Sequence, residues 1–490
     1  MKNEDSCFQS ISLCGKKIPF RFWIGVMIFM TTFVNYVMRS NMSVSILAMT
    51  KHHKNQSHMG SCLANSTFDN LTTPLTTLAP VIPKFEDEGI FETREYTQRQ
   101  QSQILAAYGY GYVASSVLGG FLSEYFGPWK TVFYSNLGMV IFTVLCVPAA
   151  LIHWTALFAT RVLIGALGGV VYPAVQVLIS RWAPKEEKGK FLSAMLGNTL
   201  GTAIAFPVIG LISQYMNWAW GFFFIGIVVS LYLIAIFFIL SDGPDKSTLI
   251  SEEEKDYLAV AVPPPKEKLV APYYQIFTSV PFYGLLGAHV ANLYGLFVLI
   301  ISVPKFFKEY LGQDLKQSGI LSAMPQLFRL VSGILFGIIG DKLESKNYIS
   351  VTALRKSFIL FSHIIPGVCM ICMQFVGCNQ LAATALLVLT QAFNGAVVCT
   401  NLRNPQDLAP NFAGTIFGII SLIAGCTQFI VPVVTGELLG DNPNPGLDRW
   451  KWVFLIGGGN YILGGLIFIL LASGKKQSWN EPKETKASIT

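Results

Sequence analysis

Residues 219–240 read AWGFFFIGIVVSLYLIAIFFIL, an apolar stretch without a charged side chain. About 20 such residues in a helix are long enough to cross the hydrocarbon core of a bilayer. Other stretches share this character, so the sequence predicts twelve spans, at 22–49, 102–122, 131–152, 155–180, 192–214, 219–240, 277–303, 317–339, 357–377, 381–401, 411–435 and 452–472. All should be helices, because lipid offers no hydrogen-bond partner to an open backbone. The predicted fold class is therefore an all-α membrane protein.

The composition agrees with a membrane location. The chain is 52% hydrophobic and 13% charged, whereas an ordinary soluble domain is about 25% charged. Its net charge of +7 does not indicate nucleic-acid binding, because the cations gather in particular short loops. The expected partners are the lipid bilayer and a small ligand, and we expect a functional monomer.

The positions of Lys and Arg predict the orientation. Cationic segments precede the first span and follow the second, fourth, eighth and twelfth, whereas the opposite short loops are poorer in cations. Both termini should therefore be cytoplasmic. The residues that carry this bias are Lys16, Lys17, Arg21, Lys130, Arg181, Lys185, Lys188, Lys190, Lys342, Lys346, Arg355, Lys356, Lys475 and Lys476.

The long loop 50–101 should then be external. It carries three N-x-Ser/Thr sequons, at Asn55, Asn65 and Asn70, which we expect to be glycosylated. The first apolar stretch is too long for a cleavable signal peptide and lacks a small-residue cleavage site. Cys62 in this loop and Cys378 lie on the same predicted side, so a bridge between them is one alternative. The other is that all nine cysteines are packing residues.

A polar stretch with three consecutive prolines, 241–276, divides the chain into two halves of six spans. The predicted organisation is a cytoplasmic tail (1–21), an N-terminal half (22–240) that includes the glycosylated loop 50–101, a cytoplasmic linker (241–276), a C-terminal half (277–472) and a second cytoplasmic tail (473–490). Many secondary carriers consist of such repeated halves around a binding site at the membrane midplane.

A local motif repeats between the halves. Gly120 and Glu124, with Lys130, close the second span, and Asp341 and Lys342 close the eighth, which is its counterpart. An acid beside a cation can hold a short loop in one conformation. We therefore predict that these residues form conformational latches, with a solvated turn as the alternative for either copy.

Basic side chains lie inside apolar stretches that contain no Asp or Glu, and we single out Arg39, Arg161, His289 and Arg329. A cation at the middle of a span costs roughly 3 kcal/mol. The negative partner is therefore expected to be a ligand, which predicts a carrier of small anions. The alternatives are that Arg39 and Arg161 extend to the membrane surface, that His289 is a neutral packing residue, and that Arg329 bonds a neighbouring helix.

Several motifs occur in a fixed order along the chain: Tyr36-Val-Met-Arg39-Ser-Asn41-Met-Ser43, Gly111-Tyr112 before Gly119-Gly120, Arg161-Val-Leu-Ile-Gly165 through Tyr172-Pro173, and Asp407-Leu-Ala-Pro410. With this ordered set the chain resembles the major facilitator superfamily from about residue 19 to 481. More narrowly, it is similar to the anion transporter family of sodium/phosphate cotransporters, sialin and vesicular glutamate transporters. In particular, it resembles insect inorganic phosphate cotransporters.

The resemblance implies the major facilitator fold, in which the first, fourth, seventh and tenth spans line a central cavity. Arg39 and Arg161 match the family's substrate-handling arginines, and His289 falls on a cavity helix. A guanidinium suits phosphate or carboxylate because its planar fork donates two parallel hydrogen bonds. Polar residues in spans that could complete a substrate site are Tyr36, Tyr112, Tyr172, Asn292, Tyr294, Gln391 and Asn394.

The chain departs from the proton-coupled members of that family at Gly168, where they carry Glu seven positions after the arginine. Coupling to protons through that acid is therefore not expected, and sodium is the candidate co-transported ion. No cofactor and no metal site are expected. Asp407 should cap the helix that begins with Pro410.

These observations predict an alternating-access secondary transporter of small anions, most simply a sodium-dependent symporter of inorganic phosphate or an organic anion. The alternatives are a potential-driven uniporter or exchanger of organic anions, and a non-transporting sensor that kept the fold. The spans contain no catalytic Ser/His/Asp set, metal cluster or paired carboxylates, so we expect no enzyme. The N-terminal tail lacks a clear acidic dileucine signal, which favours the plasma membrane over lysosomal or vesicular membranes.

Overall fold

The computed structural model describes residues 12–13, 16–50, 62, 91, 93–184, 187–262, 271–440 and 445–481. In this part of the chain, twelve helical segments are long and apolar enough to cross a membrane, and each overlaps one predicted span. The predicted all-α class is confirmed. The described strands, β1 (Ser12–Leu13) and β2 (Lys16–Lys17), form a short antiparallel pair before the first span.

The chain forms two compact units. Unit 1 comprises Met1–Lys51, Pro80–Tyr96 and Gln103–Lys266, and unit 2 comprises His52–Ala79, Thr97–Ser102 and Glu267–Thr490. The predicted half boundaries fall close to these limits. However, His52–Ala79 of the first long loop and Thr97–Ser102, which contains the first turn of the second span, belong to unit 2.

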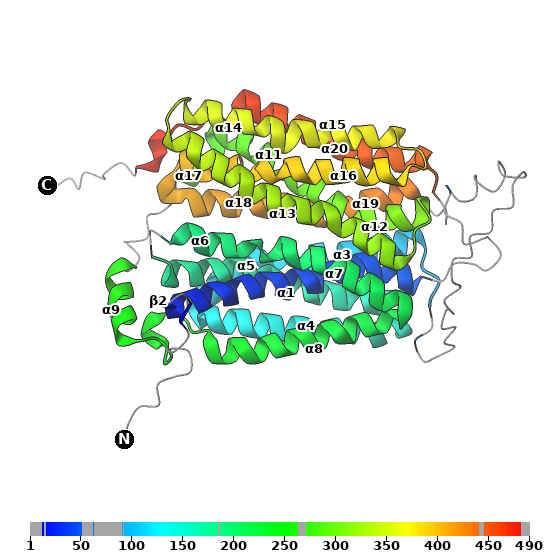
Figure 1. Ribbon diagram of the computed structural model, residues 1–490, viewed down its shortest axis with the longest axis horizontal. Helices are drawn as coiled ribbons and strands as arrows, with labels where there is room; N and C mark the ends of the chain where they lie inside the picture. Colours follow the sequence, from blue (N-terminus) through cyan, green and yellow to red (C-terminus); the bar gives the residue numbers. More distant parts are fainter. Residues whose placement is uncertain are drawn as a thin grey trace, which may run out of the picture. The chain divides into compact units, whose positions relative to one another are not determined.

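Unit 1 contains the first six spans, and Figure 1 shows them as long, roughly parallel helices. Within this unit α1 packs along α7, and α4 packs along α5 and α8. A 3-10 turn, Ala194–Leu196, joins α6 to α7 in the fifth span, and another, Pro244–Lys246, follows the sixth. The helices are α1 (Phe20–Met49), α3 (Gln98–Phe126), α4 (Pro128–Ile152), α5 (Trp154–Trp182), α6 (Lys188–Ser193), α7 (Gly197–Tyr215), α8 (Trp218–Ile239) and α9 (Glu252–Ala261).

Glycines bring α3 and α5 into close contact. A Cβ atom on Gly111 would lie 2.0 Å from the carbonyl oxygen of Val162, and one on Gly165 would lie 2.0 Å from that of Tyr108. No side chain fits at either position without moving backbone, so the two helices approach more closely than larger residues would allow. This contact sets the side chains of α3 directly against α5.

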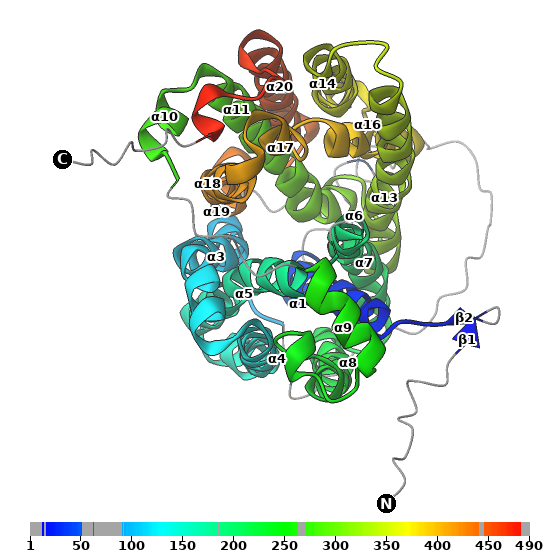
Figure 2. The same cartoon turned by 90° about the vertical axis from the view of Figure 1, so that its left-hand side faces the viewer.

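Unit 2 contains the other six spans, seen end on in Figure 2. Short π-helical turns (Val298–Ser302, Phe306–Tyr310 and Leu360–Ile364) and 3-10 turns (Met373–Phe375, Gly395–Cys399, Pro410–Phe412) interrupt several spans, and a last 3-10 turn (Ser478–Asn480) follows them. The helices are α10 (Tyr273–Thr278), α11 (Val280–Phe297), α12 (Val303–Lys305), α13 (Leu315–Ser345), α14 (Val351–Ile359), α15 (Ile365–Cys372), α16 (Gln380–Asn394), α17 (Asn404–Leu408), α18 (Ala413–Gly425), α19 (Thr427–Leu439) and α20 (Leu447–Leu471).

The predicted linker contains a folded part of unit 1. The Glu254 carboxylate of α9 accepts hydrogen bonds from the backbone N–H groups of Phe20 (2.6 Å) and Arg21 (3.1 Å) and from the Arg21 side chain (3.0 Å). The first N–H groups of a helix have no partner within it, and a negative charge is favourable there. Glu254 thus caps the start of α1 and fixes α9 beside it.

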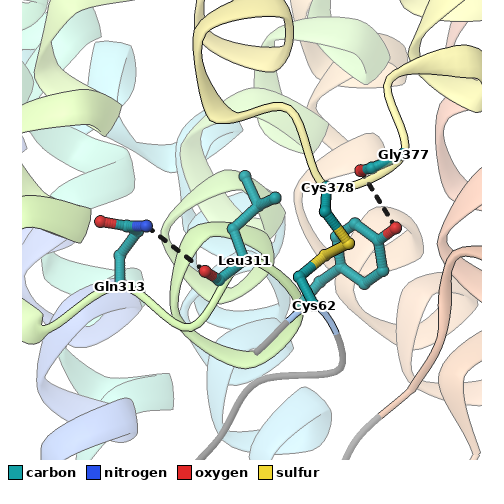
Figure 3. The surroundings of a disulfide bond; sticks show 6 residues. Cys62, Leu311, Gln313, Gly377 and Cys378 are labelled. Atoms are coloured by element: carbon teal, nitrogen blue, oxygen red, sulfur yellow. Dashed lines mark hydrogen bonds between the residues drawn. A yellow bond between two sulfur atoms is a disulfide. The ribbon is translucent and has the colours of Figure 1, made fainter. Parts of the chain in front are cut away.

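A disulfide joins Cys62 to Cys378, with the two Cα atoms 5.3 Å apart. Figure 3 shows this bond next to the loop after α15, where the Tyr310 hydroxyl donates to the carbonyl of Gly377 (3.0 Å). The bridge therefore forms, and it attaches the long loop after α1 to unit 2. The predicted glycosylation sites Asn55, Asn65 and Asn70 lie outside the described residues.

Candidate functional site

Arg39 lies well inside α1 and is 8% exposed. Its guanidinium carbon lies 4.8 Å from the ring centroid of Tyr36, 5.1 Å from that of Tyr108 and 5.7 Å from that of Tyr112. Aromatic faces attract a cation electrostatically, and more strongly where water is excluded. The side chain is packed among tyrosines, so it does not extend to the end of its helix.

Arg161 of α5 is 2% exposed and reaches across to α1. Its Nη1 and Nη2 atoms donate to the carbonyl oxygens of Met38 (3.4 Å) and Arg39 (3.2 Å). Its Nε has no hydrogen-bond partner among the described residues. The guanidinium carbon also lies 5.4 Å from the ring centroid of Tyr108. The two arginines therefore share one tyrosine, and one buried donor is left without an acceptor.

The helices around these arginines are poor in acids. The sequences of α1, α4, α5, α7 and α8 contain neither Asp nor Glu, and that of α3 contains only Glu124, in its last turn. Two buried cations in a low-dielectric setting repel each other and carry a large desolvation cost. An anion bound close to both arginines would offset their mutual repulsion and their desolvation cost. The arrangement is therefore suited to binding a small anion.

The structure brings together all the site residues predicted in unit 1. Tyr36 and Tyr172 meet edge to face with ring centroids 6.1 Å apart, and Tyr108 and Tyr112 stack at 6.0 Å. Tyr108 was not among the predicted site residues. Its spacing of four from Tyr112 places it on the same face of a helix, and this signal could have identified it.

His289 lies in unit 2 and has protein partners on both ring nitrogens. The Asn401 amide lies 2.9 Å from Nδ1, and the Ser421 hydroxyl lies 3.4 Å from Nε2. With the Asn401 amide as donor, Nδ1 is an acceptor and the proton of a neutral ring sits on Nε2. This environment fits the packing alternative for His289 better than a role in binding substrate.

Asn292 belongs to a polar chain within unit 2. Arg329 Nε donates to Asn394 Oδ1 (3.1 Å), and Asn394 Nδ2 donates to Asn292 Oδ1 (2.9 Å) and to the carbonyl of Ser362 (2.9 Å). Arg329 of α13 thus forms a hydrogen bond to a neighbouring helix, α16, which was the alternative interpretation of this residue. Two other candidates make fewer contacts: Tyr294 is half-buried, and the buried Gln391 amide has no hydrogen-bond partner among the described residues.

The predicted latch residues of unit 2 have partners other than those expected. Asp341 pairs with Arg403, and within the described chain Lys342 forms no ion pair.

Arg355 donates to Asp407 from Nε (2.8 Å) and Nη2 (3.0 Å). Asp407 was expected to cap the helix that begins with Pro410, and this is wrong. The residue at that cap is Ala409, which makes no side-chain bond.

In unit 1 the corresponding turn is held by the start of the linker. Gly127 has a φ of +96°, and Asp242 accepts a hydrogen bond from the N–H of Trp129 (3.0 Å). Lys130 makes no ion pair in the part of the chain that the structure describes. A Cβ on Gly120 would meet open space, so Gly120 is not required here by close packing.

Lys305 and Glu309 form a buried pair that was not predicted from the sequence. Their side-chain atoms lie 3.7 Å apart, and the residues are 4% and 5% exposed. Lys305 also donates to the side-chain oxygens of Gln98 and Gln101, the latter at 3.0 Å. The predicted seventh span ended at residue 303, so neither side chain was counted as buried. The spacing of four residues between the lysine and the glutamate places them on the same face of a helix, and this pattern could have indicated the pair.

No group of three His, Cys, Asp or Glu residues that could hold a metal ion occurs among the described residues.

The relatives identify the protein class. The model of the Major Facilitator Superfamily matches residues 28–432. The chain is 28% identical to sialin of Homo sapiens over 465 residues, which cover 94% of this chain and 90% of sialin.

A Drosophila melanogaster protein described as "Putative inorganic phosphate cotransporter" is 29% identical over 479 residues, covering 95% of this chain and 87% of that protein. Among solved structures, a D-xylose-proton symporter matches with a TM-score of 0.64 at 14% identity, covering 93% of this chain and 99% of the symporter, and it shows the same fold. These relatives and the fold neighbour are transporters. The chain therefore belongs to the major facilitator superfamily and is a multi-pass membrane transporter related to sialin and to inorganic phosphate cotransporters.

Proposed function

We propose that this protein is an alternating-access carrier of small anions, most simply a sodium-dependent cotransporter of inorganic phosphate or an organic anion. The observation that carries the proposal is the pair of buried guanidiniums, Arg39 and Arg161, on acid-poor helices. The names of the relatives, sialin and an inorganic phosphate cotransporter, support an anionic substrate.

In this proposal Arg39 and Arg161 bind the anion, and Tyr36, Tyr112 and Tyr172 surround them. His289, Asn292 and Tyr294 remain sequence predictions for the other half. No cofactor takes part. The protein acts as a monomer in the plasma membrane, with both termini in the cytoplasm and loop 50–101 glycosylated outside. Oxidising compartments favour disulfides, so the Cys62–Cys378 bridge supports an external position for the loop that contains Cys62.

The energetics favour a co-transported cation. Moving a monovalent anion into a cell at about −60 mV costs about 1.4 kcal/mol, and a divalent anion about twice that. Gly168 carries no acid that could deliver a proton, and a Cβ there would lie 2.4 Å from the Tyr108 hydroxyl. Sodium can bind to carbonyl and hydroxyl oxygens alone, so it is the proposed co-ion.

Uptake by purified protein in proteoliposomes tests this function. Labelled phosphate and a panel of organic anions are offered under imposed sodium, pH and voltage gradients. Accumulation of an anion that requires inward sodium supports the symporter, and accumulation driven by voltage alone supports the uniporter or exchanger. Absence of uptake and exchange for every anion would favour a sensor.

The same assay tests the site. Arg161→Ala should abolish uptake while the elution profile and thermal transition of the purified protein stay close to those of the wild type. Arg161→Lys should restore little activity, because an ammonium lacks the planar fork. Normal uptake by Arg161→Ala would remove Arg161 from the proposed site.

A further inference from the structure

Tyr108 has a buried hydroxyl that the protein itself does not use. The residue is 3% exposed, and its hydroxyl oxygen has no hydrogen-bond partner among the described residues. Leaving a buried donor unpaired costs roughly 1–3 kcal/mol. Such a group is therefore a candidate for contact with a ligand or an ordered water.

The ring that carries this hydroxyl lies close to both cations of the proposed site. The ring of Tyr108 packs against both Arg39 and Arg161, with centroid distances of 5.1 and 5.4 Å. Arg161 Nε is a second buried donor without a described partner. Two unpaired donors thus accompany two positive charges, on helices that supply almost no acidic acceptor.

Gly168 determines where the hydroxyl sits. A Cβ atom at this position would lie 2.4 Å from the hydroxyl oxygen of Tyr108 and 3.3 Å from Cε of Met139. The tyrosine cannot retreat easily, because its backbone is pressed against Gly165. The absence of a side chain at residue 168 therefore leaves room for the phenolic group.

Building on the proposed function, we infer that Tyr108 is a specificity-determining hydrogen-bond donor, and that with Arg161 it selects an oxyanion with several acceptor oxygens, such as inorganic phosphate. Gly168 is the positioning residue that leaves the hydroxyl its place. Phosphate has four oxygens around one centre, so it can accept from Tyr108 and from Arg161 Nε at the same time. Such an anion can offer each donor a separate acceptor oxygen.

The test uses full-length protein and inorganic phosphate as the probe. Tyr108→Phe removes the hydroxyl but keeps the ring against both arginines. We expect the KM for phosphate uptake to rise roughly 10- to 100-fold, the loss typical of a hydrogen bond to a charged group. The maximal rate should change much less, because the bond acts in binding. The stabilisation of the detergent-solubilised protein by phosphate should fall in parallel.

A double-mutant cycle separates this role from a packing role. Gly168→Ala should raise the KM in the tyrosine protein, because the new methyl group displaces the hydroxyl. It should add less in the Tyr108→Phe protein, where no hydroxyl remains and the methyl group meets only the ring carbon Cζ, at 3.1 Å, and Met139. Additive effects of the two changes on KM would overturn the positional link between Gly168 and Tyr108.

The matched control is Tyr134→Phe, a loss of the same hydroxyl from a side chain on α4 that is 62% exposed; its KM should equal that of the wild type. If the wild type transports phosphate and Tyr108→Phe has the same KM, the inference about Tyr108 is overturned and the proposed function is not. Wild-type protein that neither transports phosphate nor is stabilised by it overturns phosphate as the substrate, and the inference with it.

Discussion

Buried charges are stabilised in two different ways in this protein. Arg39 lies among aromatic rings on acid-poor helices. Lys305 instead has an acid on its own helical segment, Glu309, together with two glutamine oxygens. The first arrangement surrounds a cation with aromatic rings, and in the proposed function an anion binds there. The second neutralises itself, which makes it a structural element of unit 2.

The Lys305–Glu309 pair leads to a prediction about stability. Lys305→Ala should lower the stability by about 3–5 kcal/mol, because it leaves the Glu309 carboxylate buried without a counter-charge. Replacing both residues, Lys305→Met with Glu309→Gln, should recover much of the loss. Thermal unfolding of the detergent-solubilised protein, followed by tryptophan fluorescence, ranks the stabilities of the wild type, the single variant and the double variant.

Lys475→Ala, at an exposed lysine, is the control and should leave the transition unchanged. A double variant as unstable as the single variant would show that the pair does not act as a unit.

At the scale of elements, polar residues that begin helices can be read from the sequence. Ser251, Asp314 and Ser350 each accept a hydrogen bond from a backbone N–H in the first turn of the helix that follows. These contacts are local, as helix caps usually are. Glu254 caps α1 from 233 residues away along the chain, and no local pattern predicts such a cap.

The contact between α9, α1 and the loop after α5 leads to a prediction about pH. Arg21 Nε donates to Glu187 (2.8 Å), and this hydrogen bond lowers the pKa of Glu187 below its ordinary 4.5. A carboxyl whose folded pKa is depressed stabilises the fold above its unfolded pKa. This stabilisation is lost as the pH falls through the folded pKa.

The difference in melting temperature between the wild type and Glu187→Gln should therefore be constant above pH 4.5 and shrink at lower pH. The measurement is a series of melting curves from pH 7 to about pH 3. Glu253→Gln, at an exposed position on α9, should show a small difference that varies little with pH. A difference for Glu187→Gln that grows on acidification would contradict the assignment.

At the scale of the whole molecule, the disulfide relates two loops that are far apart in the sequence. Cys62 and Cys378 are separated by 316 residues, and the loops follow the first and ninth spans. With twelve spans, both loops must lie on the same side of the membrane. The bridge therefore agrees with the twelve-span topology and with an oxidising environment on that side.

Labelling of cysteines tests this arrangement together with the orientation. Cys62→Ser should expose a free Cys378 thiol that reacts with a membrane-impermeant maleimide on intact cells, whereas the wild type should stay unlabelled. The Cys62→Ser/Cys378→Ser protein is the control and should lose the signal. Among surface-biotinylated molecules, labelling of Cys62→Ser only after permeabilisation would place these loops in the cytoplasm.

The sequence by itself determined the twelve spans and the all-α class, and it predicted the two halves and the roles of Arg39 and Arg161. These features follow from local hydropathy and from the cost of a charge in lipid, so they need no knowledge of packing. Family motifs added Tyr36, Tyr112 and Tyr172; the structure places Tyr36 and Tyr112 against Arg39, and Tyr172 against Tyr36.

Only the tertiary structure decided which side chains face one another. It placed Tyr108 close to two guanidiniums, showed that Asp407 binds Arg355 and does not cap a helix, and gave His289 two protein partners. Each of these contacts joins residues that are far apart in the sequence. They depend on how closely and on which faces those helices pack, which is set by long-range fit that the periodicity of a single segment does not contain.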